Sequence, residues 1–223
     1  MIWHVAERTR RARGLERVIV ATDDARIAQA VESTGAEVMM TRGDHPTGTD
    51  RLAEVARSLD AALVVNVQGD LPLIDPDMIE RLVARLTTEP TLPMATLATP
   101  LLDTAEWVSS HVVKVVWDHA GRALYFSRSP IPFDRDGRWR PGQALGWRHI
   151  GMYGYRRDVL LALAAWPPSP LEEREQLEQL RALEHGIAIG VVEWSAAGPL
   201  IEVDTPEDLE RARAALGGAR ARA

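Results

Sequence analysis

The segment Asn66-Val67-Gln68-Gly69-Asp70 carries side chains suited to a metal-bound phosphate. It follows Leu63-Val64-Val65, an apolar run that predicts a fully buried parallel strand. Ligands of open α/β sheets bind just beyond the carboxyl ends of the strands. Gly69 lets the backbone turn or approach a ligand closely, and Asp70 offers a hard oxygen to Mg²⁺. A strand-end turn with a solvated aspartate explains the same residues, so both interpretations stay open.

A second carboxylate that could share this metal is Asp204, in Glu202-Val203-Asp204-Thr205-Pro206. It lies at a predicted strand-to-helix junction, where it can meet a carboxylate from a neighbouring strand end. Two such side chains could hold Mg²⁺ between substrate phosphates. An aspartate just before a capped helix often only stabilises the helix dipole, however. Taken alone, the pattern favours that structural role.

The loop from Asp44 to Arg51, which includes His45, could contact an anion or a planar ligand. We expect Thr49 to cap the following helix, whose free N–H groups could face an anion or a base edge. The small residues around Gly48 permit close approach of a planar ligand. A plain capped loop explains the same residues.

A fourth cluster is the predicted strand Arg148–Tyr155, in which alternation places His149, Gly151, Tyr153 and Tyr155 on one face. His149 and Tyr153 could together reach a polyhydroxylated acid, although a lone histidine on a strand is more often structural. Further along, the pair Glu178-Gln179 interrupts an ordinary amphipathic helix. By itself this pair indicates only solvated surface.

The composition narrows the class of protein. A chain of 223 residues can bury a proper core, and its net charge of -6 argues against a dedicated nucleic-acid binder. The lack of cysteine excludes a disulfide framework, a thiol nucleophile and a cysteine-based zinc site, and fits a reducing cytosol. Neither a bilayer-spanning apolar run nor a signal-peptide h-region is visible. We therefore expect a cytoplasmic protein with no membrane partner.

The elements that must position these residues change in character along the chain. The first two-fifths alternate helix and strand signals, which is typical of a parallel sheet wrapped by helices. Beyond residue 94 the pattern predicts a hairpin over 112–126, a long loop over 134–146, helices over 158–165 and 171–185, a strand over 187–194 and a helix from 205. We expect one compact domain over 1–216 and a flexible tail over 217–223.

Taken together, these clusters resemble the family of 3-deoxy-manno-octulosonate cytidylyltransferases, which make CMP-activated KDO for lipopolysaccharide. The resemblance runs from about Met1 to Leu216. The resemblance rests on the order and spacing of nine matching segments. These segments are Val18–Asp23, Met40–Arg42, Gly48–Glu54, Asn66–Asp70, Met94–Ala98, Ala123–Arg128, His149–Tyr155, Leu177–Arg181 and Val203–Glu210.

The resemblance implies an α/β, Rossmann-like nucleotidyltransferase with a mixed, mostly parallel sheet and a small β-rich region, about 100–155, for dimerisation and sugar binding. It implies that CTP and KDO give CMP-KDO and pyrophosphate with Mg²⁺ in a homodimer. By analogy Asp70 and Asp204 bind the metal. The nucleotide would be held by His45, Gly48, Thr49, Arg51 and Gln68, and the sugar acid would be contacted by His149, Tyr153, Glu178 and Gln179.

The chain departs from the family pattern in two places. An N-terminal strand, central in the family's sheet, and the Arg- and Lys-bearing loop that grips the triphosphate have no counterpart, because Met1-Ile2 aligns with the helix after that loop. Neighbouring strands would then lose a ladder partner and the phosphates their principal cations. We expect impaired activity and stability, and a truncated or mis-started reading of a longer protein. Leu71 also replaces a usual glutamate, with a modest effect.

Two other classes compete with this interpretation. A glycosyltransferase that binds a finished nucleotide sugar also places an aspartate at a strand end on a metal. A non-catalytic or impaired paralogue that kept the sugar pocket is supported by the missing phosphate loop. The residues do not choose between KDO and an amino-substituted analogue, and the preference for CTP over UTP rests on the resemblance.

Overall fold

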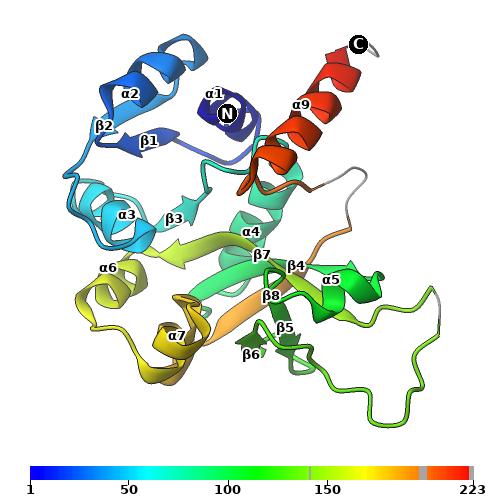
Figure 1. The fold of residues 1–223 in the computed structure, drawn as a ribbon. Coiled ribbons are helices and arrows are strands. Elements are labelled where there is room, and N and C mark those ends of the chain that lie inside the picture. The colour runs from blue at the N-terminus through cyan, green and yellow to red at the C-terminus, as the bar shows by residue number, and fades with distance from the viewer. Residues whose placement is uncertain (141, 196–199, 221–223) are drawn as a thin grey trace.

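The computed structural model describes residues 1–140, 142–195 and 200–220. Its N-terminal half alternates helices and strands, as the sequence predicts (Figure 1). In chain order these are α1 (Ile2–Thr9), β1 (Ile19–Thr22), α2 (Ala25–Val31), the 3-10 helix η1 (Glu32–Thr34), β2 (Glu37–Met40), α3 (Gly48–Arg57), β3 (Leu63–Asn66) and α4 (Pro76–Thr88).

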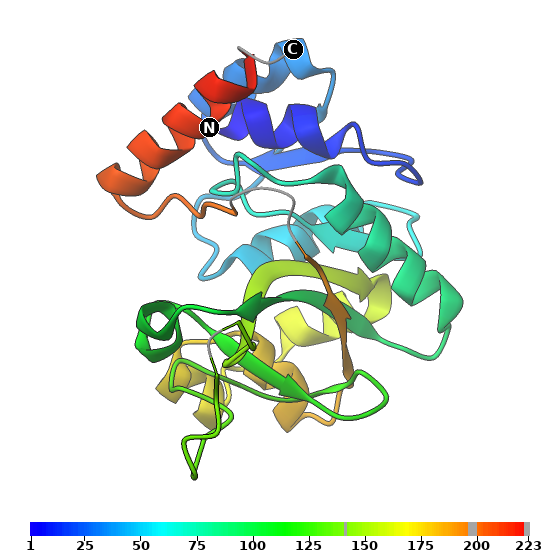
Figure 2. The same cartoon turned by 90° about the vertical axis from the view of Figure 1, so that its right-hand side faces the viewer.

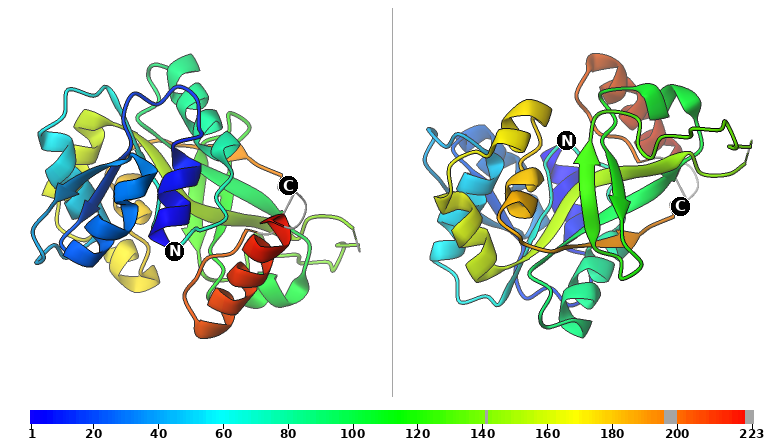
Figure 3. Two further views of the ribbon diagram at one scale, coloured as in Figure 1. Left: turned by 90° about the horizontal axis from the view of Figure 1, so that it is seen from above. Right: turned by 90° about the horizontal axis from the view of Figure 1, so that it is seen from below.

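The C-terminal half contains longer strands and shorter helices. They are β4 (Met94–Leu101), α5 (Thr104–Val108), β5 (Lys114–Trp117), β6 (Ala123–Ser127), β7 (Gly146–Arg156), α6 (Arg157–Ala165), α7 (Pro170–Glu175), α8 (Gln179–Glu184), β8 (Ile189–Glu193) and α9 (Pro206–Arg220). The predicted β5–β6 hairpin is confirmed, and in the view from below it crosses β7 at a steep angle (Figure 3). The terminal helices α1 and α9 lie at the same end of the molecule (Figure 2).

The described strands form two separate sheets. β1 pairs only with β2, in parallel, whereas the larger sheet has the order β6-β5-β7-β4-β8 with β3 on the free part of β7. The predicted mixed sheet is confirmed, but "mostly parallel" is wrong for the larger sheet, because β7 runs antiparallel to β3, β4 and β5. For the same reason the predicted parallel pairing of β3 is wrong, and this strand is half-buried rather than fully buried.

Polar side chains fix the starts of several helices. Asp24 and Asp75 each accept a hydrogen bond from the backbone N–H two residues on, and they thereby cap α2 and α4. At α3 the prediction is wrong by two residues, because Thr47 rather than Thr49 accepts from Asp50 N. Thr49 lies in the first turn, which frees its hydroxyl for a contact elsewhere.

Two predicted boundaries in the C-terminal half are also wrong. The helix expected over 171–185 is split into α7 and α8, because Gln176 adopts a left-handed conformation with φ of 55°. The helix α9 continues to Arg220, so the tail expected from Gly217 is helical over 217–220, and 221–223 lie outside the described residues. Within the described ranges, no helix combines the length and apolarity needed to cross a bilayer.

The apolar core is divided along the sheet. One cluster packs β4, β7 and β8 against α6 and α8, and another packs α4 against β4 and β7 around Leu82, Leu86 and Met152. Beneath α1 only a small cluster forms, built on Ala6, Val20 and Val31. The N-terminal sheet is therefore the least well packed part of the fold.

Candidate active site

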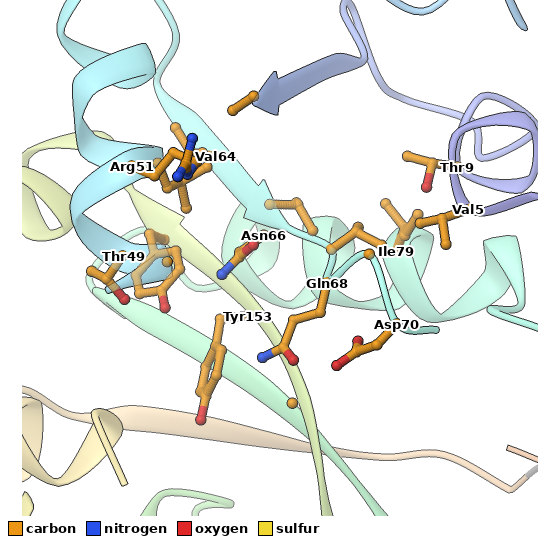
Figure 4. Close-up of a pocket in the computed structure, with 18 of the residues that line it drawn as sticks. Val5, Thr9, Thr49, Arg51, Val64, Asn66, Gln68, Asp70, Ile79 and Tyr153 are labelled. Atoms are coloured by element: carbon orange, nitrogen blue, oxygen red, sulfur yellow. The ribbon is translucent and has the colours of Figure 1, made fainter. Parts of the chain in front are cut away.

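A cavity of about 1920 Å³ separates the two sheets and extends over the face of β7 (Figure 4). One part is apolar and lies between β1 and β3. The other part is polar and begins where β3 ends, and Figure 4 shows Gln68, Asp70 and Tyr153 directed into it. Of the residues predicted from the sequence, all but one line this cavity: Gly48, Thr49, Arg51, Gln68, Asp70, His149, Tyr153, Glu178, Gln179 and Asp204.

The two predicted metal aspartates converge in the polar part of the cavity. Val203 N donates to Asp70 O at 3.0 Å, which ties the segment before α9 to the end of β3. Burial, and then the charge of Asp204, raises the pKa of the Asp70 carboxyl. Asp70 Oδ1 is buried with no hydrogen-bond partner. The charged form of this carboxyl is therefore destabilised by its surroundings, and a cation bound beside it would stabilise that form.

The donor set fits Mg²⁺ rather than a metal held wholly by protein. No group of three or more His, Cys, Asp or Glu side chains in the described ranges could enclose an ion. Mg²⁺ is usually bound by one or two carboxylates, with waters and substrate phosphates at its other positions. Asp70 and Asp204, with an orphaned carboxylate oxygen between sheet and α9, meet that requirement.

An ion pair that lies beside these aspartates was not predicted from the sequence. Arg148 Nη2 lies 3.3 Å from Glu202 Oε2, and both residues line the cavity. Burial raises the pKa of Glu202, with Arg148 opposing and both aspartates adding to the rise. The available signal was the alternation of an extended segment, which places Glu202 on the same side as Asp204. Arg148 thus offsets the negative charge that three neighbouring carboxylates create.

The predicted face of β7 is assembled by a shift in register opposite Thr96 and Leu97. The rings of His149 and Tyr153 lie 5.3 Å apart, centroid to centroid, and those of Tyr153 and Tyr155 lie 5.8 Å apart. Thr96 Oγ1 lies 2.8 Å from Met152 O, to which it donates, and 3.0 Å from His149 Nε2. Since the hydroxyl has one proton, it accepts from His149 Nε2–H, which leaves Nδ1 as an acceptor.

The His149 imidazole is uncharged, and we expect this to show in the pH dependence of stability. Burial, helped by Arg148, lowers the pKa of His149 to about 3. Below about pH 6.5 the unfolded chain binds a proton that the folded chain does not, so stability falls with decreasing pH by at most about 1.4 kcal/mol per unit from this group. Urea unfolding of His149→Gln between pH 7 and 4 should show a shallower decline than wild type. Equal slopes would contradict the assignment.

Gln68 and Gly151 face each other across the cavity floor. A Cβ placed on Gly151 would lie 3.2 Å from Gln68 Nε2, so the missing side chain leaves room for the amide. Because Gln68 is predicted to hold the nucleotide, we expect Gly151→Ala, which displaces its amide, to raise the KM for the nucleotide roughly three- to tenfold, with little change in kcat. Gly217→Ala in α9 is the matched control, because its Cβ meets nothing within 4 Å. Equal KM values for the two variants would contradict the role of Gln68.

The start of α3 is joined to the pair Glu178-Gln179 over a long sequence distance. Thr49 Oγ1 donates to Glu178 Oε2 at 2.5 Å. Gln179 is buried, and its Nε2 has no hydrogen-bond partner. An unpaired amide donor at a cavity wall is costly unless a ligand accepts from it. The break between α7 and α8 thus places these two side chains at the cavity, which an unbroken amphipathic helix would not predict.

Among the residues predicted to bind the nucleotide, His45 alone does not line the cavity. Its side chain is 6% exposed, and its Nε2 contacts Glu54 Oε2 of α3. His45 is absent from the residues that line the cavity. The ring therefore joins the 44–51 loop to α3, and the contact of His45 with a nucleotide stays a prediction.

Each arginine that lines the cavity in the described ranges already has a partner. Arg51 Nη1 lies 2.8 Å from Asp23 Oδ1, and Arg128 donates to the backbone carbonyls of Ser110, Glu175 and Gln176. The remaining pairs are Arg17 with Glu37, Arg148 with Glu202, and Arg181 with Glu172. A highly charged anion would have to compete for these guanidinium groups.

The Rossmann-like α/β fold, with two carboxylates in its cavity, fits the class of nucleotidyltransferases, and the family match below shows that class. The sequence pattern of the cytidylyltransferase family matches residues 1–189. The chain is 56% identical to the 3-deoxy-manno-octulosonate cytidylyltransferase of Syntrophotalea carbinolica, over 98% of this chain and 88% of the relative. It is 52% identical to the same enzyme of Geobacter sulfurreducens, over 95% and 86%. The chain belongs to the 3-deoxy-manno-octulosonate cytidylyltransferase family.

Solved structures agree with this assignment. The structure of a CMP:2-keto-3-deoxy-manno-octonic acid synthetase in complex with CTP superimposes with a TM-score of 0.90 at 44% identity, covering 98% of this chain and 88% of that one. A 4-diphosphocytidyl-2C-methyl-D-erythritol synthase from Anaerococcus prevotii superimposes with a TM-score of 0.62 at 15% identity, over 97% and 85% of the chains. That second likeness shows the fold alone.

Proposed function

We propose that this protein transfers the cytidylyl group of CTP to KDO, giving CMP-KDO and pyrophosphate, for lipopolysaccharide synthesis. The observation that carries the proposal is the convergence of Asp70 and Asp204 beside an unpartnered, buried carboxylate oxygen. The relatives described above are 3-deoxy-manno-octulosonate cytidylyltransferases, which supports the choice of substrates.

In the proposed reaction the anomeric hydroxyl of KDO attacks the α-phosphorus of CTP in line, and pyrophosphate leaves. Asp70 and Asp204 would hold Mg²⁺, which supplies charge neutralisation and polarises the hydroxyl when bound. Gln68, with Gly48, Thr49 and Arg51 at the start of α3, would hold the nucleotide. His149, Tyr153, Glu178 and Gln179 would orient the sugar acid, so that the reacting atoms meet with little further loss of entropy.

The test is pyrophosphate release by the purified chain with CTP, KDO and Mg²⁺. Parallel reactions replace CTP with UTP, KDO with its amino-substituted analogue, or both substrates with a nucleotide diphosphate sugar and an acceptor. Pyrophosphate formed only with CTP and a 2-keto sugar acid is expected. Sugar transfer from the nucleotide diphosphate sugar, without pyrophosphate, would favour the glycosyltransferase instead.

A second candidate, an impaired protein that binds the sugar acid without transferring to it, is favoured by the arginines. Since every described arginine that lines the cavity has a partner, a triphosphate would have to displace that partner to bind one of them. Calorimetric titration distinguishes the candidates. KDO binding without measurable CTP binding would support the impaired form, and binding of both would support the transferase.

The proposal also includes a homodimer that acts in the cytoplasm, where its nucleotide is available. Large apolar side chains are exposed within the region predicted for dimerisation, at Leu102, Val108, Leu124 and Phe133. Phe133 is 81% exposed, which is unusual for an isolated surface. Sedimentation velocity should give a dimer, and Phe133→Ser with Leu124→Ser should shift it toward the monomer. A wild-type monomer at all concentrations would contradict the dimer.

A further inference from the structure

A fully buried lysine has no part in the reaction proposed above. Lys114 begins β5, and burial, followed by the charge of Arg128, lowers the pKa of its ammonium group. An ammonium group has three N–H donors and no acceptor. Lys114 Nζ donates to Ser109 O at 2.9 Å and to Val112 O at 2.7 Å, and it also contacts Arg128 O. These three backbone carbonyls are therefore held around one cation.

The carbonyls that Lys114 gathers belong to two segments that border the cavity. Two of them lie in the loop before β5, whose residues 111–113 line the cavity. The third belongs to Arg128, which directly follows β6 and also lines the cavity. Arg128 reaches back to the same loop, because its Nη1 donates to Ser110 O at 3.0 Å. The two cations thus fix the loop and the end of β6 relative to each other.

Arg128 also joins this cluster to the turn between α7 and α8. Its guanidinium donates to Glu175 O at 2.8 Å and to Gln176 O at 3.3 Å. The Glu175 carboxylate accepts from the Arg128 N–H at 3.0 Å. It also accepts from Ser127 Oγ at 2.7 Å and from Tyr125 Oη at 3.3 Å, both on β6. The turn is therefore attached to β6 through its backbone and through a side chain.

The backbone of this turn requires such support. Gln176 has a φ of 55°, in a left-handed region that residues other than glycine rarely adopt. A conformation of this kind persists only where the surrounding structure fixes it. Glu178 and Gln179 follow within the next three residues, and both line the cavity. Their placement therefore depends on the conformation of Gln176.

We propose that Lys114 is a positioning residue for the sugar-acid side of the site. Through Arg128 it holds the α7–α8 turn in the conformation that places Glu178 and Gln179 at the cavity. This inference rests on the proposed function, in which those two side chains contact KDO. Among the residues that the structure describes, neither Lys114 nor Glu175 lines the cavity, so each acts without touching a ligand.

The first measurement is the steady-state kinetics of Lys114→Met, which removes the three donors and keeps an unbranched side chain. We expect the KM for KDO to rise roughly tenfold, with kcat within about threefold of wild type. The KM for CTP should change less than about twofold, because Thr47 caps α3 and holds Thr49 in place independently of the turn. Glu175→Gln loosens the same turn from its other side without emptying buried space, and it should raise the KM for KDO as well.

Arg156→Met is the matched control. Arg156 also donates to three backbone carbonyls, but it does not line the cavity; its acceptors are Leu86 O, Glu89 O and Leu92 O. Its loss should lower the Tm, as the loss of Lys114 does, without raising the KM for KDO. An equal rise in both variants would show that the KM follows general stability, and this would overturn the proposal. An unchanged KM in both Lys114→Met and Glu175→Gln would overturn it too.

Hydrogen exchange of single backbone amides, measured without substrates, separates this proposal from the proposed function. The Leu177 amide donates to Glu172 O and the Arg181 amide donates to Glu178 O, so both report on the turn. In Lys114→Met these two amides should exchange roughly tenfold faster than in wild type, beyond any change in the β4 amides that report general stability. If this occurs in a protein that releases no pyrophosphate, the proposed function fails and the positioning role stands. Unchanged exchange of the two amides would overturn the positioning role, whatever the activity.

Discussion

Asp70→Asn is expected to lower the rate of pyrophosphate release by roughly 10²–10³-fold, because a carboxylate that holds the metal contributes several kcal/mol to transition-state stabilisation. The same variant should have a higher Tm than wild type without metal. Burial and the neighbouring Asp204 raise the pKa of Asp70, so its charge opposes folding at neutral pH, and the amide removes that charge. Steady-state kinetics and thermal unfolding with and without Mg²⁺ measure both effects.

Asp204→Asn and the double variant provide the matched comparison. If both carboxylates act through one ion, the double variant should be little slower than either single variant. Near-normal turnover of Asp70→Asn would remove its metal role. A fall in Tm, together with lost activity, would indicate that Asp70 only supports the fold.

Arg181→Met is expected to lower the free energy of unfolding by about 3–5 kcal/mol, the largest effect on stability that we predict. Arg181 donates to both oxygens of Glu172, at 2.7 Å from Nε to Oε2 and 2.5 Å from Nη2 to Oε1, and also to Leu163 O at 3.0 Å. Both side chains are buried, so the variant would leave the Glu172 charge without a partner. Urea unfolding at pH 7 measures the change.

Arg174→Met in α7 is the control, because that side chain is exposed and its loss should cost less than about 0.5 kcal/mol. Adding Glu172→Met to Arg181→Met should recover part of the loss, since the buried charge is then gone. Equal free energies of unfolding for Arg181→Met and Arg174→Met would show that the Arg181–Glu172 ion pair does not stabilise the fold. The α7–α8 turn carries Glu178, so sugar-acid affinity should fall with Arg181→Met as well.

Secondary structure could be predicted from the sequence where it depends only on residues that are neighbours in the chain. The alternation of helices and strands in the first two-fifths of the chain and the hairpin over 112–126 follow from neighbouring residues, and the structure confirms both. The sequence predicted that Asp70 and Asp204 would meet from two neighbouring strand ends. Only Asp70 follows a strand, because residues 200–204 before α9 form none, so this part of the prediction is wrong although both side chains line the cavity.

Features that depend on tertiary contacts could not be predicted in this way. The apolar letters of Leu63–Val65 are typical of a fully buried strand, yet here one edge of β3 lies open to the cavity. The break at Gln176 lies in a chain segment held by Arg128, which donates to its carbonyl from another element. The contact of His45 with Glu54, which follows it by nine positions and lies on α3, could not be predicted from the loop alone either.

The most direct test of the central claim is the binding of Mn²⁺, as a substitute for Mg²⁺, followed by electron paramagnetic resonance. With CTP present, wild-type protein should bind one ion, and Asp70→Asn and Asp204→Asn should each abolish or greatly weaken that binding. Ion binding that is undiminished in either variant would contradict a metal shared by the end of β3 and the segment before α9.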